Sequence, residues 1–137
     1  MNPLVVAADV YLPGLILPLL NVYGLFGLFA FLVVLLLLET LVLVLVKWAG
    51  FGRALLASLL MNLISTILGV ILDLTLWDWQ LWWVILIAFA ASVIVEGGVL
   101  MLMKQTTFRL NIIAAVAANL ASYLILILPA YLFVMAL

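Results

Sequence analysis

The sequence predicts an all-α, polytopic membrane protein whose four transmembrane helices form two tandem hairpins. Three observations support this fold class. Of the 137 residues, 73% are hydrophobic and 7% are charged, and the mean hydropathy is +1.65, well above a typical soluble domain, which is about half apolar. Four apolar stretches are long enough to cross the ~30 Å hydrocarbon layer of a membrane. A set of polar residues also recurs at a fixed spacing along the chain.

The repeat aligns residue i with residue i+57. There are ten identities over residues 39 to 69, but aliphatic identities are expected by chance in a leucine-rich chain. The evidence for a repeat therefore comes from the polar and charged matches, which are Glu39 with Glu96, Lys47 with Lys104, Asn62 with Asn119, and Ser65 with Ser122. We expect a duplicated hairpin, with the first repeat over residues 23–76 and the second over residues 77–137.

Residues 1–22 precede the first repeat and are apolar but broken. Pro3, Pro13 and Pro18 interrupt them, and proline removes a backbone hydrogen bond that lipid cannot replace. No basic residue precedes the apolar run, as a signal peptide would require. We expect an interfacial or partner-covered segment with short helical turns.

The four predicted spans cover residues 23–46, 54–72, 80–103 and 110–137, and Pro129 is expected to kink or end the last one. Each is long enough to cross the hydrocarbon layer at ~1.5 Å per residue. Between the second and third spans lies an aromatic cluster around Asp78, typical of a belt at the membrane surface. Its predicted interfacial anchors are Trp77, Trp79, Trp82 and Trp83.

All four basic residues fall in two of the predicted loops. Lys47 and Arg53 lie between the first and second spans, and Lys104 and Arg109 lie between the third and fourth. Because cytoplasmic loops are enriched in Lys and Arg, both hairpin loops are expected in the cytoplasm and both termini outside. The two hairpins would then be related by an axis along the membrane normal, in a bacterial cytoplasmic or thylakoid membrane.

Four polar residues share one predicted depth inside the membrane. Glu39 and Asn62 lie eight and nine residues from the basic loop between them, and Glu96 and Asn119 lie eight and ten residues from theirs. This places all four about 12 Å inside the cytoplasmic edge. We expect one polar layer in which each Glu meets the Asn of its own hairpin or of the other, together with Ser65 and Ser122.

Small and polar residues also mark one face of each of the last three spans. The second span carries a stripe of Ser58, Asn62, Ser65 and Gly69, the third carries Ala88, Ser92 and Glu96, and the fourth carries Ala114, Ala118 and Ser122. Such stripes let membrane helices approach closely and hydrogen-bond across the contact. They predict the inward faces of these spans.

Composition excludes several classes of function. The chain has no Cys and no His, which removes disulfides, thiolate sites and imidazole ligation of zinc or haem. We therefore expect no metal site, and the sequence indicates no particular cofactor. Four basic residues and a net charge of −1 leave no basic surface for nucleic acid. No external loop is long enough for an aqueous active site, so we do not expect an enzyme.

The hairpin pattern resembles a known family. Glu39, Val42, Leu43, Asn62, Ser65 and Gly69 in the first repeat, and Glu96, Gly97 and the stretch from Asn119 to Tyr123 in the second, are similar to the filament integrity family of septal-junction membrane proteins of filamentous cyanobacteria. The resemblance covers residues 39–70 and 95–128. It implies a role in maintaining cell-to-cell junctions and names no catalytic residue. That family has a longer polar connection between its halves than the LTLWDWQ stretch here.

Three functions follow as hypotheses. The leading one is a non-enzymatic assembly subunit of a larger membrane complex, bound to lipids and to other integral membrane subunits, because the chain offers apolar helix faces and almost no loops. The second is a proton or cation transporter that uses Glu39 and Glu96, since an ionisable residue inside a membrane is a functional candidate. The third is an accessory lipid- or pigment-binding subunit of a photosynthetic or respiratory complex.

Overall fold

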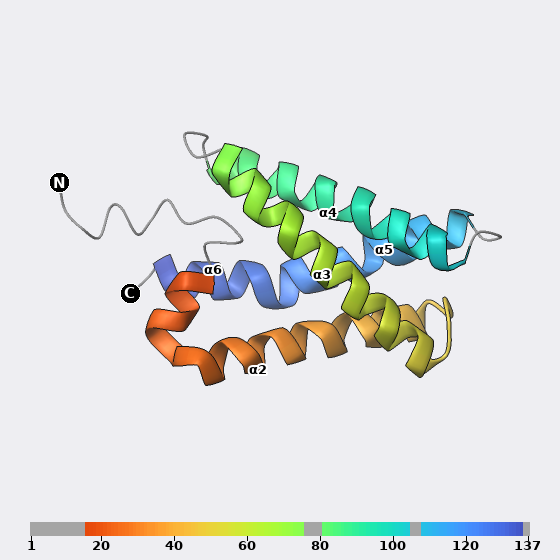
Figure 1. Ribbon diagram of the computed structural model, residues 1–137, viewed down its shortest axis with the longest axis horizontal. Helices are drawn as coiled ribbons and strands as arrows, with labels where there is room; N and C mark the ends of the chain where they lie inside the picture. The colour runs from red at the N-terminus through yellow and green to blue at the C-terminus, as the bar shows by residue number, and fades with distance from the viewer. Residues whose placement is uncertain (1–15, 76–80, 105–107, 136–137) are drawn as a thin grey trace.

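Four long helices form the protein in the computed structural model, which describes residues 16–75, 81–104 and 108–135 (Figure 1). The described residues contain helices and turns and no strand. Helix α2 covers Ile16–Leu45, α3 covers Phe51–Thr75, α4 covers Leu81–Met103 and α5 covers Phe108–Ser122. The last helix continues through a π-helical turn, η3, at Tyr123–Ile127 into α6 at Leu128–Met135.

The predicted all-α membrane fold is confirmed. Among the described residues, four helices are long and apolar enough to span a membrane, and these candidate spans lie close to the predicted ones: Gly24–Leu45, Phe51–Leu68, Ile85–Met103 and Phe108–Ala130. Helices α2 and α4 each pack against both α3 and α5, so the four helices form a closed ring. The ends of the two hairpins where α2 passes into α3 and where α4 leads toward α5 lie at the same end of the molecule (Figure 1).

The first helix begins earlier than the predicted span. Its backbone is helical from Ile16, and Pro18 is tolerated there because the first turn of a helix needs no N–H partner. At Gly24 the backbone has φ 67° and ψ −174°, a conformation that glycine adopts readily, and α2 bends there. Residues 16–22 of the expected interfacial segment are thus helical and lie ahead of this kink, while residues 1–15 lie outside the described range.

The fourth helix is irregular just before Pro129. Proline has no N–H to donate to the carbonyl four residues earlier, and the preceding turn is π-helical, with the Leu128 N–H donating to the Tyr123 carbonyl. The helix then continues to Met135. Pro129 is therefore preceded by a π-helical turn and does not end the helix. Of the two expected outcomes, a kink or an end of this span, the helix end is not observed.

The interior of the ring is built from small residues and a few large ones. Leu43, Trp48, Met61 and Leu100 are the largest buried apolar side chains. They pack against five alanines that are also inaccessible, namely Ala54, Ala57, Ala114, Ala115 and Ala118. Alanine at these contacts lets the helix backbones approach closely, as is usual in membrane proteins.

Candidate functional site

The carboxyl layer

The two glutamates of the repeat lie in the centre of the ring. Glu39 on α2 and Glu96 on α4 are each 2% exposed, although their helices are on opposite sides of the ring. They are close enough for an electrostatic interaction between the two carboxyl groups. We call these two residues and their polar partners the carboxyl layer, which comprises Glu39, Ser58, Asn62, Ser65, Glu96, Asn119 and Ser122.

Glu39 is held mainly by the helix that follows it in the chain. The Asn62 Nδ2 group donates a short hydrogen bond to Glu39 Oε2, and the Ser58 hydroxyl lies 3.1 Å from the same oxygen. Asn62 Nδ2 is also 2.9 Å from the Ser58 carbonyl oxygen, so both of its hydrogens have an acceptor. The stripe on α3 thus faces the carboxyl group directly.

Glu96 repeats this arrangement in the second hairpin. Asn119 Nδ2 donates to Glu96 Oε2 at 2.6 Å and to the Ala115 carbonyl oxygen at 3.0 Å. Asn119 and Ala115 are the residues that the repeat aligns with Asn62 and Ser58. The asparagine therefore has the same two acceptors in both repeats, a carboxylate of its own hairpin and a carbonyl one turn earlier on its own helix.

One serine of the layer connects the two hairpins. Ser65 on α3 donates to Glu96 Oε1 on α4 at 2.6 Å. Ser122 on α5 lies near the Glu39 carboxyl group, and its hydroxyl donates to the Asn119 carbonyl oxygen of its own helix at 3.1 Å. Each glutamate thus accepts a hydrogen bond from the asparagine of its own hairpin, and Glu96 also accepts one from the other hairpin, a choice that the sequence left open.

The other predicted packing residues are mostly buried beside this layer. Ala88, Ala114 and Ala118 are buried. Ser92 is half-buried and contacts the hydroxyl of Tyr123, whose ring packs edge to face on Phe89 with a centroid separation of 5.2 Å. Gly69 lies within α3, but its surroundings are outside the description.

The loop-end cluster

A second group of buried polar residues, not predicted from the sequence, lies at the hairpin turns. Trp48 and Asn111 are fully buried, and Trp48 Nε1 donates to Asn111 Oδ1 at 2.7 Å. Asn111 Nδ2 donates to the Lys104 carbonyl oxygen at 2.8 Å, and Lys104 Nζ returns to the Trp48 carbonyl oxygen at 2.8 Å. We call Trp48, Lys104 and Asn111 the loop-end cluster.

This cluster divides the four basic residues into two kinds. Lys104 donates within the cluster and lies 6.0 Å from the centre of the Trp48 ring, and Arg53 Nη2 donates to the Met103 carbonyl oxygen at 2.8 Å. Both therefore join one hairpin to the other. The side chains of Lys47 and Arg109 make no hydrogen bond or ion pair to another described residue, and Lys47 and Arg109 are exposed.

One signal in the sequence pointed to Asn111. Asn111 precedes Ala114, Ala118 and Ser122 on the same helical face, so it extends the predicted stripe of the fourth span. Its repeat counterpart is Ala54, and that of Trp48 is Gln105, so neither residue belongs to the set of repeated polar residues. Among the predicted anchors, Trp83 is 58% exposed, whereas Trp77, Trp79 and the Trp82 side chain lie outside the description.

The hydrogen bonds of the carboxyl layer join helices to one another. The glutamate oxygens accept from side chains on neighbouring helices of the same molecule. Among the described residues, no three acidic side chains come together as a metal site would need.

No protein-family model, curated protein or solved structure matches the chain.

Proposed function

We propose that this protein is a non-enzymatic assembly subunit of a bacterial membrane complex. In this role the ring of helices is a self-supporting unit, and its outer faces contact other integral membrane subunits. The observation that carries the proposal is the direction of the polar side chains. The amides and hydroxyls of the carboxyl layer turn inward onto Glu39 and Glu96, while the outer faces are apolar.

The first helix is the best candidate for the contact with a partner. The buried share of its most apolar stretch is 17%, against 33% for the fourth span. Leu25, Phe26 and Phe29 are 66% to 84% exposed on it. The resemblance to the filament integrity family supports a role of this kind at a septal junction, and a photosynthetic or respiratory complex is an alternative setting.

Site-specific photocrosslinking in the native membrane tests this role. A photoreactive amino acid at Phe26 or Phe29 is expected to yield one discrete crosslinked polypeptide, identified by mass spectrometry. The same group at Leu124, exposed on the last helix, is the matched control for random collision. Crosslinks to lipid alone from both α2 positions, together with a monomer in mild detergent, would contradict the proposal.

We also propose that the hairpin turns face the cytoplasm, which the position of the basic residues supports. The natural chain has no cysteine, so a single Gly50→Cys change provides a unique label, and Gly50 has open space around it. A membrane-impermeant maleimide is expected to label this cysteine in inside-out vesicles and to leave it unlabelled in intact cells. The reverse pattern would place the turns outside.

The rival function is proton or cation transport, and the proximity of the two carboxyl groups favours testing it. Changing both Glu39 and Glu96 to Gln removes the titratable groups while an amide replaces each carboxyl group. Liposomes with the natural protein would show an ion or pH flux that this double variant abolishes if transport is the function. An absence of flux in both supports the assembly role.

A further inference from the structure

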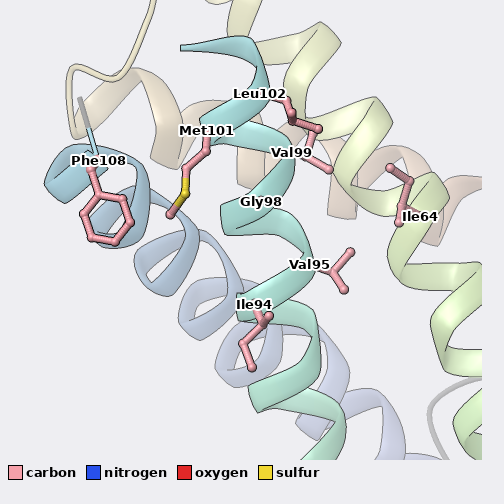
Figure 2. A pocket seen from close by; sticks show the side chains of 8 residues that line it. All are labelled: Ile64, Ile94, Val95, Gly98, Val99, Met101, Leu102 and Phe108. Atoms are coloured by element: carbon pink, nitrogen blue, oxygen red, sulfur yellow. The ribbon is translucent and has the colours of Figure 1, made fainter. Parts of the chain in front are cut away.

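The outer face of α4 carries a shallow depression. Gly98 lies in it, and larger side chains surround it, with Ile94 and Leu102 one turn away on either side along α4 and Ile64 across on α3 (Figure 2). A methyl group added to Gly98 would meet no atom within 4 Å. In the first repeat the aligned residue is Leu41, whose side chain is 52% exposed on the outer face of α2.

The lining of this groove is apolar throughout. Besides Gly98 it consists of Ile64, Ile94, Val95, Val99, Met101, Leu102 and Phe108. Several of these side chains are open to the surroundings, with Ile94 74% and Leu102 79% exposed. The occupant must therefore be apolar where it meets α4.

The length of the groove favours a lipid acyl chain over a transmembrane helix as its occupant. Ile94 and Leu102 are eight residues apart, or about 12 Å along the helix, and Phe108 continues the groove at the start of α5. One leaflet of the hydrocarbon layer is about 15 Å deep. The groove therefore lies within a single leaflet, the one on the side of the hairpin turns, whereas a transmembrane partner would contact a face that crosses both.

A basic residue follows the groove residue Phe108 in the chain. Arg109 directly follows Phe108 in the chain, and its exposed guanidinium makes no hydrogen bond or ion pair to any described residue. The nearby Arg53 and Lys104 are already engaged with carbonyl oxygens. Basic residues at a membrane surface attract anionic headgroups, and Arg matches the geometry of a phosphate group.

We propose that this groove binds one anionic phospholipid, with an acyl chain over Gly98 and the headgroup phosphate on Arg109. The position of Gly98 over which the acyl chain would lie has no open counterpart in the first repeat, because Leu41 occupies the corresponding position there. The assignment does not depend on the assembly role, since a transporter of the same structure would carry the same groove.

The test is native mass spectrometry of the full-length protein in non-ionic detergent. Dioleoyl phosphatidylglycerol and dioleoyl phosphatidylcholine carry the same chains and differ in headgroup charge. The natural protein is expected to retain one phosphatidylglycerol in preference to phosphatidylcholine. Arg109→Gln should reduce this preference about fivefold, whereas Lys47→Gln, which removes another exposed charge from the other hairpin, should leave it nearly unchanged.

The groove itself is tested by filling it. Gly98→Leu, which copies the residue of the first repeat, is expected to lose retained lipid of both kinds, and Gly98→Ala should lose an intermediate amount. Val116→Leu adds bulk on an exposed part of α5 outside the groove and is the matched control. Circular dichroism and size-exclusion chromatography check that each variant is folded.

Several results would overturn the assignment. Retention by both Gly98 variants at the natural level would show that the lipid lies elsewhere. Equal losses from Arg109→Gln and Lys47→Gln would show that the charge acts only through the overall field. Displacement of the lipid by excess inorganic phosphate would mean that Arg109 binds a free anion, and photocrosslinking from Ile94 to a polypeptide instead of a lipid would assign the groove to a protein partner.

Discussion

The two carboxyl groups of the carboxyl layer receive hydrogen bonds from side chains on neighbouring helices. Glu39 on α2 accepts from Ser58 and Asn62 on α3, and Glu96 on α4 accepts from Ser65 on α3 and Asn119 on α5. A hydrogen bond of this kind between membrane helices contributes ~0.6–2 kcal/mol. The loss of a residue from this layer should therefore weaken contacts that involve all four helices.

A comparison of Gln and Ala at Glu96 tests this role. Gln keeps one acceptor for Asn119, and its amide can donate to the Ser65 hydroxyl, which is able to accept as well as donate. We expect Glu96→Gln to stay within about 1 kcal/mol of the natural protein and Glu96→Ala to lose ~2 kcal/mol or more. Equilibrium unfolding by SDS in mixed micelles, followed by circular dichroism, measures both. Equal losses in the two variants would contradict a hydrogen-bonding role.

Trp48 provides a second residue-scale prediction. Trp48→Phe removes the indole N–H and leaves the buried Asn111 oxygen without its donor, while the aromatic packing is largely kept. An unsatisfied buried acceptor costs about 1–3 kcal/mol, so this variant should unfold at a lower SDS fraction. Trp83→Phe, at an exposed position, is the control and should change little. A neutral Trp48→Phe would show that the bond does not contribute.

The sequence predicted which residues would share a depth, and it could not predict which would bond. Counting residues from the loops gives the height of Asn62 and Asn119, but the choice between two carboxyl groups depends on the rotation of each helix about its axis. Trp48 was missed for a different reason. A tryptophan beside a basic loop is typical of a surface anchor, and only the fold brings Asn111, 63 residues away, to its indole nitrogen.

At the scale of elements, the end of α2 shows how a turn between spans is made. Lys47 has φ 58°, its N–H donates to the Val44 carbonyl, and the Trp48 N–H donates to the Leu43 carbonyl, each at 2.9 Å. This is the Schellman arrangement, in which a residue in the left-handed conformation terminates the helix. Leu43 and Trp48, which flank the motif, are both fully buried.

The left-handed position predicts an unusual gain in stability. Glycine lacks the Cβ that makes this conformation costly, so Lys47→Gly should stabilise the protein by about 1 kcal/mol. Lys47→Ala removes the same charge and keeps the Cβ, which makes it the matched control. The SDS midpoints of the two variants give the comparison. A glycine variant no more stable than the alanine variant would argue against strain at this turn.

The helices themselves were predictable because spanning length and apolar composition depend only on local sequence. Their irregularities were less so. Gly24 was one of several glycines in the chain, and nothing local distinguished it as the position where α2 bends. Pro129 led to the expectation of an irregularity in the last span, and the structure has a π-helical turn at Tyr123–Ile127. The position of this turn ahead of Pro129 was not predicted, because it depends on how the carbonyl groups that precede the proline find other donors.

At the scale of the whole molecule, two sets of contacts hold one hairpin to the other. Ser65 of the carboxyl layer donates to the other hairpin in the interior, and Arg53 and Lys104 donate across to the other hairpin at the turns. The apolar contacts alone give membrane helices little directional preference, because lipid is as apolar as the side chains. These polar contacts therefore specify how the hairpins are aligned.

A comparison of two neighbouring residues on α3 distinguishes the alignment of the hairpins from the simple loss of a hydroxyl group. Ser65→Ala removes a bond to the other hairpin, whereas Thr66→Ala removes a bond to the Asn62 carbonyl of the same helix at an exposed position. We expect a loss of ~0.6–2 kcal/mol for Ser65→Ala and less than about 0.5 kcal/mol for Thr66→Ala. Unfolding in mixed micelles again supplies the measurement, and similar losses would argue against alignment by Ser65.

The repeated Glu–Asn bond of the carboxyl layer, with Ser65 bonded across to the other hairpin, has a consequence for how such a chain can arise. One hairpin carrying a Glu, an Asn and a Ser contains every type of group that the carboxyl layer needs, so two identical copies would complete the layer as a homodimer about a twofold axis. Covalent fusion of the copies then frees each half to diverge. The Trp48 and Asn111 pair, with Gln105 and Ala54 as its counterparts, is an asymmetric contact of the kind that only a fused chain can hold in a single copy.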